Sequence, residues 1–193
     1  MGADVTDESQ VNTVVAEVAE RFGGIDVLVN NAGISVGAPI SDESHSEAWT
    51  VSLDVMLTGQ VRLVRAALPH LRQSDAARII NIASTEALGA TPYLSPYTAA
   101  KHGVVGLTRS LATELGREAI TVNCVCPGPI RTAMTDAIPE DQKTIYAKRR
   151  VPLRRYAEPE EVAHMVLNLA LPASSFVTGA TIAVDGGLTI KNA

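Results

Sequence analysis

Apolar positions along the chain alternate between two periods. Between residues 11 and 22 they return every three to four positions, as on one face of a helix, whereas residues 25–29 form a short continuous apolar run. This alternation of helical segments and short apolar runs continues to residue 184. It predicts helices at about 11–22, 44–71, 96–115 and 158–171, and strands at about 25–29, 78–83, 120–126 and 180–184.

Residues that start and stop elements support these boundaries. The run Asp7-Glu8-Ser9-Gln10 resembles a capping box before the first helix, and Gly23-Gly24 is suited to end that helix. Pro96 fits the first turn of the third helix, and Gly116 follows its end. Pro127-Gly128-Pro129 breaks the third strand, because proline cannot donate to a strand ladder.

The predicted strands are apolar almost throughout, which is typical of a parallel sheet covered by helices on both faces. In such sheets ligands bind beyond the carboxyl ends of the strands. Three polar segments directly follow strands, at Asn30–Gly33, Ser84 and Pro127–Thr132. We therefore expect a binding site at this edge of the sheet.

Composition and charge narrow the classes of protein and partner. The 193 residues are 46% hydrophobic and 19% charged, which fits one globular domain over residues 1–193. The net charge of −5 and the lack of a basic stripe argue against a nucleic-acid partner. No apolar run is long enough to span a membrane. Cys124 and Cys126 lie two residues apart on one strand and cannot easily bridge, which fits a reducing cytoplasm and no metal site.

Tyr97 and Lys101 lie four residues apart, with Ser84 thirteen residues before the tyrosine. On a helix the phenol and the ammonium would share one face. A cation about 4 Å away favours the phenolate by roughly 4 kcal/mol at an effective dielectric of 20, before desolvation is subtracted. The spacing therefore predicts a tyrosine whose pKa is lowered toward neutrality, able to act as general acid or base. The same spacing also occurs on ordinary exposed helices, so it does not define a site alone.

Taken together, several motifs resemble those of the classical short-chain dehydrogenase/reductase family, in the same order and over essentially the whole chain. The matching segments are Asn30-Asn31-Ala32-Gly33, Ser84, Tyr97 with Lys101, residues 122–132, Thr178-Gly179 and residues 184–187. The resemblance implies an α/β fold, a Rossmann-like doubly wound parallel sheet. It also places residues 133–150 where the family has a variable substrate lid.

The resemblance implies an oxidoreductase that transfers a hydride between NAD or NADP and a carbonyl or secondary alcohol. Tyr97 would exchange a proton with the substrate oxygen, Lys101 would lower its pKa and bind the nicotinamide ribose, and Ser84 would hold the substrate oxygen. The expected partners are a small-molecule carbonyl or alcohol and further copies of the chain, as a dimer or tetramer. No choice between NAD and NADP follows.

The resemblance also assigns cofactor contacts, with Asp4 at the adenine and Ile130 and Thr132 at the carboxamide. The full set is Asp4, Asn31, Ala32, Gly33, Tyr97, Lys101, Pro127, Gly128, Ile130 and Thr132. Structural roles remain alternatives for two of them. Asn31 is suited to the left-handed backbone of a turn, and Thr132 is a suitable cap for a following helix.

The chain departs from the family pattern at its start. It has no T-G-x-x-x-G-x-G turn to receive a cofactor pyrophosphate. The opening run GADVTD resembles the end of the family's third strand, which predicts a sheet truncated at its N-terminal side. The strand at 25–29 would then be an exposed apolar edge, open to pairing with another chain.

A second departure is Met56, seven positions after Trp49, where the family has an asparagine thought to hold a water in a proton relay to the lysine. A thioether accepts hydrogen bonds weakly and cannot donate. The relay would then be impaired; alternatively, Met56 fills core space and Ser52 or a water elsewhere compensates. The second candidate function is accordingly a catalytically impaired or inactive homologue that acts, if at all, through subunit association.

Overall fold

The computed structural model describes residues 2–191 and contains a four-stranded parallel sheet. Its strands are β1 (Val27–Asn30), β2 (Arg78–Ile82), β3 (Thr121–Pro127) and β4 (Thr181–Val184), in the order β1-β2-β3-β4. All four predicted strands are confirmed; β1 begins two residues later than its apolar run. Parallel neighbours require crossover connections, and helices supply them here.

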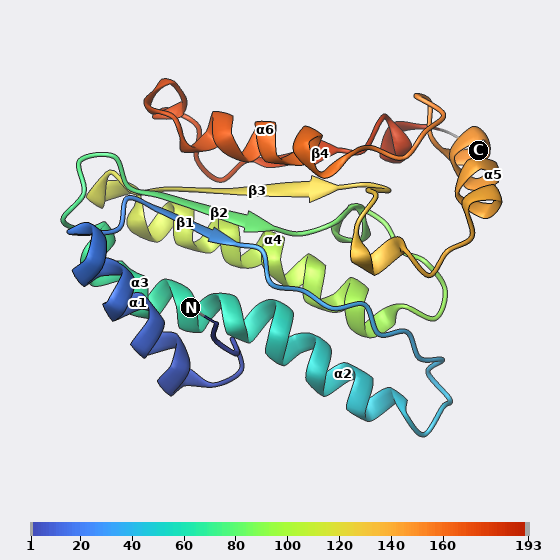
Figure 1. The fold of residues 1–193 in the computed structure, drawn as a ribbon, viewed down its shortest axis with the longest axis horizontal. Coiled ribbons are helices and arrows are strands. Elements are labelled where there is room, and N and C mark those ends of the chain that lie inside the picture. The colour runs from blue at the N-terminus through green and yellow to red at the C-terminus, as the bar shows by residue number, and fades with distance from the viewer. Residues whose placement is uncertain (1, 192–193) are drawn as a thin grey trace.

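Helices lie on both sides of the sheet, as Figure 1 shows. The helix α4 (Ser95–Leu115) lies against one face, with α1 (Glu8–Phe22), α2 (His45–Leu53) and α3 (Gly59–Leu71) on the same side. The opposite face carries α6 (Pro159–Ala170), which contacts β2, β3 and β4. The strands point toward the end of the molecule that carries α5 (Glu140–Arg150). This helix lies in the expected lid segment and was not predicted.

The first helix begins three residues before its apolar period. The Asp7 carboxylate accepts the backbone N–H groups of Ser9 and Gln10 at 2.9 and 3.1 Å, which satisfies donors that have no partner inside the helix. The helix ends at Gly23, which adopts φ 81° and donates its N–H to the Ala19 carbonyl. Polar capping thus extends the helix beyond the residues that pack.

The long helix predicted at 44–71 is continuous but not uniform. A π-helical turn at Asp54–Thr58 separates α2 from α3, and Met56 within it is fully buried. One extra residue per turn rotates the following segment relative to the preceding one. The helix predicted at 44–71 does not include this turn, which changes the hydrogen-bond pattern within a continuous helix.

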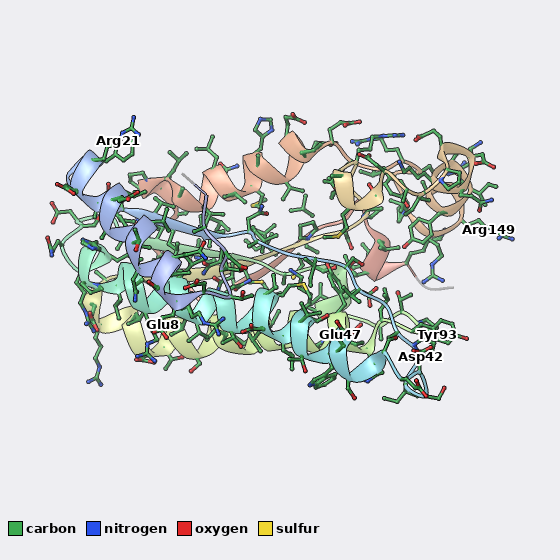
Figure 2. The ribbon with its side chains drawn as sticks, turned by 60° about the horizontal axis from the view of Figure 1, so that its bottom comes forward. Glu8, Arg21, Asp42, Glu47, Tyr93 and Arg149 are labelled. Atoms are coloured by element: carbon green, nitrogen blue, oxygen red, sulfur yellow. The ribbon has the colours of Figure 1, made fainter. Side chains whose placement is uncertain are left out.

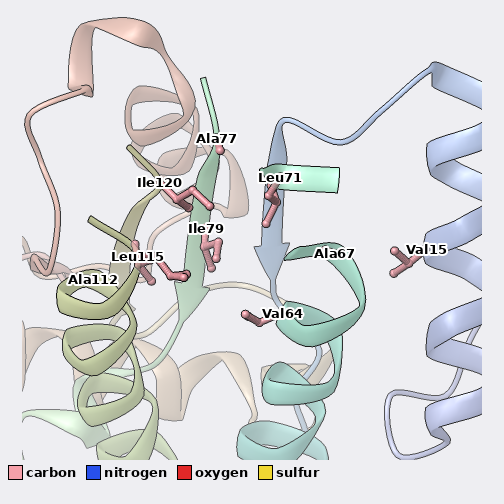
Figure 3. Packing of buried hydrophobic residues seen from close by; sticks show 10 residues of the cluster. Val15, Val64, Ala67, Leu71, Ala77, Ile79, Ala112, Leu115 and Ile120 are labelled. Carbon is pink, nitrogen blue, oxygen red and sulfur yellow. The ribbon is translucent and has the colours of Figure 1, made fainter. Parts of the chain in front are cut away.

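The core forms two layers on either side of β2 and β3. Figure 3 shows the larger cluster, in which Ile79 and Leu115 pack with side chains of α1 and α3. Ile80 and Val125 point to the opposite face and pack with Leu169 of α6. Because neighbouring strand residues point to opposite faces, both layers require apolar side chains. This explains the continuous apolar runs in the sequence.

The strand β1 is covered on one face only. Leu28 packs against the α1–α3 core, whereas Val27 and Val29 are 36% and 41% exposed. Within residues 2–191, β1 pairs with β2 alone, so its other edge presents unpaired backbone groups. The expected apolar edge is confirmed.

None of the helices in the described part of the chain is long and apolar enough to cross a lipid bilayer.

We predict that Val27→Lys reduces self-association of the 193-residue chain without unfolding it. A charge on the open face opposes strand addition at this edge, while the core face of β1 stays apolar. Sedimentation velocity across a concentration series measures the association, and circular dichroism checks the fold.

Leu28→Lys is the matched control, because this neighbouring side chain points into the core. It should abolish cooperative unfolding, since it buries an unpaired charge. Association of Val27→Lys equal to that of the wild type would contradict the prediction.

Candidate functional site

A cleft of about 800 Å³ opens beyond the carboxyl ends of β1, β2 and β3. It is lined by nearly all the residues that the sequence singled out: Asn31, Ala32, Gly33, Ser84, Tyr97, Lys101, Pro127, Gly128, Ile130 and Thr132. These residues come from four separate stretches of the chain. The parallel sheet brings them together because its strands all end at the same edge.

Asp4 is the exception. Its carboxylate accepts the backbone N–H and the hydroxyl of Thr6 at 2.9 and 2.8 Å, and these two bonds hold its pKa below the usual range. It is absent from the residues that line the cleft. The structure therefore gives Asp4 a local turn contact and does not join it to the other candidates.

Ser84 lies two residues after the end of β2 and precedes a short 3-10 turn at Thr85–Ala87. Its backbone is extended, with φ −170° and ψ 165°, and its hydroxyl accepts the N–H of Glu86 at 3.1 Å. Capping this turn fixes the hydroxyl at the end of the strand, facing the cleft. Tyr97 reaches the same cleft from the first turn of α4.

Lys101 lies one helical turn after Tyr97 and is only 4% exposed. Its Nζ donates to the carbonyl of Ile82 at 3.0 Å and lies 5.6 Å from the centroid of the Tyr97 ring. Burial lowers the pKa of Lys101 to about 8, although the neighbouring Cys124 and Cys126 sulfurs oppose the shift. The two thiols are themselves free and buried, with their sulfurs 4.0 Å apart.

The predicted lowering of the Tyr97 pKa is wrong for this structure. Burial raises the pKa of Tyr97 above its ordinary value; the nearby Ser84 hydroxyl opposes the rise, and the charge of Glu86 adds to it. The ammonium of Lys101 is turned toward Ile82 and does not offset desolvation. The sequence argument counted the attraction between two charges and could not count the loss of water around the phenol.

A chain of side-chain hydrogen bonds fixes the turn after β1. Asn30 is buried and donates to Asn81 at 2.8 Å; Asn81 donates to Thr108 at 2.9 Å, and Thr108 donates to the carbonyl of Val104 at 2.8 Å. This series of hydrogen bonds joins β1, β2 and α4. It holds the Asn31–Gly33 turn at a fixed distance from the helix that carries Tyr97 and Lys101.

Met56 lies beside this turn. A Cβ at Gly33 would be 3.8 Å from Lys101 Nζ and 4.0 Å from Met56 Cγ, so the three residues meet at one point. Met56 is fully buried, as expected of a residue that fills core space. Ser52 and Gln60, one turn to either side, have buried polar atoms without a hydrogen-bond partner within residues 2–191.

The segment after β3 is shaped by a close approach. A Cβ at Gly128 would lie 2.8 Å from Asp185 Cα, so only glycine lets the two loops pass this closely. Thr132 precedes the short turn at Ala133–Thr135; its N–H donates to the Thr135 hydroxyl at 3.1 Å, and its carbonyl accepts the Thr135 N–H at 2.8 Å. Thr132 also lines the cleft.

Several lining residues were missed by sequence reasoning. The helix α6 contributes Pro159, Val162, Ala163 and Val166, whereas Met134 comes from the segment at 133–150 that the resemblance places as a substrate lid. The amphipathic pattern predicted α6 as a helix, but no local signal shows which face meets the cleft. Glu86, whose charge reaches Tyr97, was missed for the same reason.

The chemistry of this arrangement is proton transfer at an oxygen atom. A buried phenol that stays protonated at neutral pH lies beside a hydroxyl donor in a largely apolar cleft. Such a pair can polarise a carbonyl oxygen and then protonate it. Within residues 2–191, no three His, Cys, Asp or Glu side chains are grouped so as to hold a metal ion.

Comparison with known proteins places this geometry in a family. The family model described as enoyl-(acyl carrier protein) reductase matches residues 1–189. The chain is 40% identical over 187 residues to the 3-oxoacyl-(acyl-carrier-protein) reductase of Thermotoga maritima, covering 97% of this chain and 75% of that protein. It is 44% identical over 184 residues to the 3-alpha-(or 20-beta)-hydroxysteroid dehydrogenase of Mycobacterium bovis, covering 95% and 68%.

Solved structures agree in fold. The ligand-free aldohexose dehydrogenase of Thermoplasma acidophilum superposes with a TM-score of 0.93 at 34% identity, over 100% of this chain and 78% of that one. The gluconate 5-dehydrogenase of Burkholderia cenocepacia, solved with NADP and tartrate, gives a TM-score of 0.90 at 33% identity, over 98% and 74%. The chain belongs to the classical short-chain dehydrogenase/reductase family.

Proposed function

We propose that the protein is an NAD(P)-dependent oxidoreductase that interconverts a carbonyl and a secondary alcohol, with Tyr97 as general acid and base. The observation that carries the proposal is the convergence of Tyr97, Ser84 and Lys101 on one cleft at the carboxyl edge of the sheet. Relatives support it: one is named as a 3-oxoacyl reductase, another as a hydroxysteroid dehydrogenase, and a structural neighbour binds NADP.

The residues present fit the nicotinamide half of such a cofactor. Ala32 and Gly33 are small residues in the lining of the cleft, whose volume is in the range of ordinary ligand sites. The Asn31–Gly33 turn, Lys101 and the Pro127–Thr132 segment would hold it. A bound nicotinamide supplies the hydride, and the protein supplies position and the proton.

Carbonyl reduction follows from the protonation state of the site. Ser84 donates a hydrogen bond to the substrate oxygen, and protonated Tyr97 transfers its proton to that oxygen as negative charge develops there. Lys101 has a pKa of about 8, so near neutral pH it can give up a proton and take one back. The raised pKa of Tyr97 favours the acid role, and alcohol oxidation would require a higher pH.

The substrate belongs to a broad class. The similar proteins are named for substrates as different as acyl-carrier thioesters, steroids and sugars. The apolar side chains of Met134, Val162 and Val166 line the cleft and favour a partly apolar small molecule. We further propose a homo-oligomer in the cytoplasm, in keeping with the open apolar face of β1 and the reduced, buried cysteines.

A second candidate is a catalytically impaired member of the family. One observation favours it: a methionine lies beside the lysine where the resemblance implies an asparagine. Carbonyl reduction by this chain at saturating NADPH separates the two candidates, because turnover is expected only for the first.

The burial of Lys101 carries a stability cost that catalysis would explain. A pKa lowered from 10.5 to about 8 corresponds to about 3 kcal/mol at about 1.4 kcal/mol for each pH unit. A single carbonyl, that of Ile82, accepts from the ammonium, and no carboxylate pairs with it within the described residues. A packing role would be filled better by methionine.

We predict that the 193-residue chain binds NADH or NADPH much more weakly than the Thermotoga maritima reductase. The nicotinamide end of the site is present, but no backbone cradle for the pyrophosphate occurs in this sequence. Isothermal titration calorimetry on both proteins measures the difference. Low-micromolar binding by this chain would contradict the prediction and favour a competent enzyme.

We predict that Tyr97→Phe lowers carbonyl reduction by about a hundredfold or more, because it removes the proton donor and leaves the ring in place. Turnover is followed by the loss of NADPH absorbance with a panel of ketones. Tyr156→Phe is the control, since Tyr156 lies outside the cleft. Turnover retained in Tyr97→Phe would remove this residue from the mechanism.

We predict that Lys101→Met stabilises the folded chain by about 1–3 kcal/mol at pH 7 while abolishing turnover. The unfolded state binds more protons than the folded state between about pH 8 and 10.5, so wild-type stability rises with pH across this interval. The advantage of the variant should therefore shrink from pH 8 toward 10.5.

Urea unfolding at several pH values measures this difference. The exposed Lys148→Met serves as control and should change stability little at any pH. An unchanged or lower stability of Lys101→Met at pH 7 would show that burial of the ammonium is not costly.

A further inference from the structure

Glu86 makes an unusual number of fixed contacts for a half-buried side chain in a short turn. Its carboxylate accepts the backbone N–H of Thr91 at 2.9 Å, the Thr91 hydroxyl at 2.6 Å and the Thr98 hydroxyl at 3.0 Å. Within residues 2–191 it forms no ion pair. Three donors on one carboxylate hold the side chain in a single place.

These contacts join three segments around the cleft. Glu86 lies two residues after Ser84, and its own N–H donates to the Ser84 hydroxyl. Thr98 directly follows Tyr97 in the first turn of α4, and Thr91 lies in the loop between them. One carboxylate therefore connects the turn that presents the serine to the helix turn that presents the tyrosine.

The connecting loop has a second attachment on its far side. The N–H of Ala38 donates to the carbonyl of Tyr93 at 2.9 Å, and Tyr93 adopts φ 68°, a left-handed conformation that costs a non-glycine residue energy. The Tyr93 side chain is 70% exposed and lies at the opposite end of the molecule from Arg21 (Figure 2). The backbone, and not side-chain packing, thus holds this strained residue.

We infer that Glu86 is a positioning residue, which sets the distance between Ser84 and Tyr97 by tying the loop at 88–94 to the start of α4. The inference rests on the proposed function for its catalytic meaning and on the three hydrogen bonds for its geometry. Glu86 itself touches neither substrate nor cofactor in this role.

The charge of Glu86 should affect the titration of Tyr97, which a purely structural role would leave unchanged. Burial chiefly raises the pKa of Tyr97, and the Glu86 carboxylate adds to the rise. The other titratable groups near this point are Lys101, Tyr146 and His102, whose ring lies 3.0 Å from the Thr98 carbonyl. A variant that removes only the Glu86 charge should therefore shift the Tyr97 titration to lower pH.

Two variants separate the charge from the attachment. Glu86→Gln removes the charge and keeps one acceptor oxygen, whereas Thr98→Val removes one donor, keeps the charge and preserves the branched side-chain shape. Glu20→Gln on the exposed face of α1 is the matched control. If Glu86→Gln fails to fold, Thr98→Val still tests the attachment.

Amide hydrogen exchange and the ultraviolet titration of Tyr97 are measured on the intact chain, with Tyr97→Phe subtracted. In Glu86→Gln, exchange across residues 88–98 should rise about tenfold, since a hydrogen bond to a charged group is weakened, and Tyr97 should titrate at lower pH. In Thr98→Val, exchange should rise while the titration stays. Unchanged exchange in both variants would overturn the inference.

Turnover distinguishes this inference from the proposed function. If the wild type reduces ketones, Glu86→Gln should lower kcat about tenfold and change KM little. It should also shift the pH profile of kcat to lower pH, as for the Tyr97 titration. An unchanged kcat and pH profile would overturn the inference. If the wild type shows no turnover while the exchange result holds, the positioning role stands and the proposed function fails.

Discussion

Burial of β2 and β3 on both faces is the constraint on which the rest of the structure depends. Each residue of β2 is buried, so Ile79 must meet the α3–α4 layer while Ile80 meets α6. This requirement fixes the register of the sheet, because a slip of one residue would exchange the two layers. It also places the ends of three parallel strands side by side, where Ser84 and Pro127 face the helix that carries Tyr97.

The electrostatics of the site are governed by desolvation more than by attraction between neighbours. Lys101 and Tyr97 are both removed from water, and each shifts toward its neutral form. A neutral phenol and a lysine near its titration point form a proton-transfer pair that is ready to donate. The same burial weakens the fold, as expected where catalytic demands oppose stability. Glu86 holds the neighbouring loop through its hydrogen bonds, and its charge raises the pKa of Tyr97 further.

The sheet is complete at its centre and open at β1. The sequence match covers 75% of the Thermotoga maritima reductase and 97% of this chain, so that relative has further residues outside the match. Val27 and Val29 of β1 are 36% and 41% exposed. The cleft draws on the ends of β2 and β3, which are covered on both faces, and on the turn after β1, which is the open edge.

Apolar periods and strand-ending motifs are local properties of the chain, so the strands, most helices and the strand-end residues of the cleft can be predicted from the sequence. The tertiary structure adds what local patterns do not contain: burial raises the pKa of Tyr97, Asp4 lies outside the cleft, Met56 lies in a π-helical turn beside Lys101, and α6 lines the cleft. Each of these depends on water excluded or on contacts made between distant segments. The spacing of residues along the chain contains no information on desolvation or on contacts between distant segments, so the apolar pattern could not predict these features.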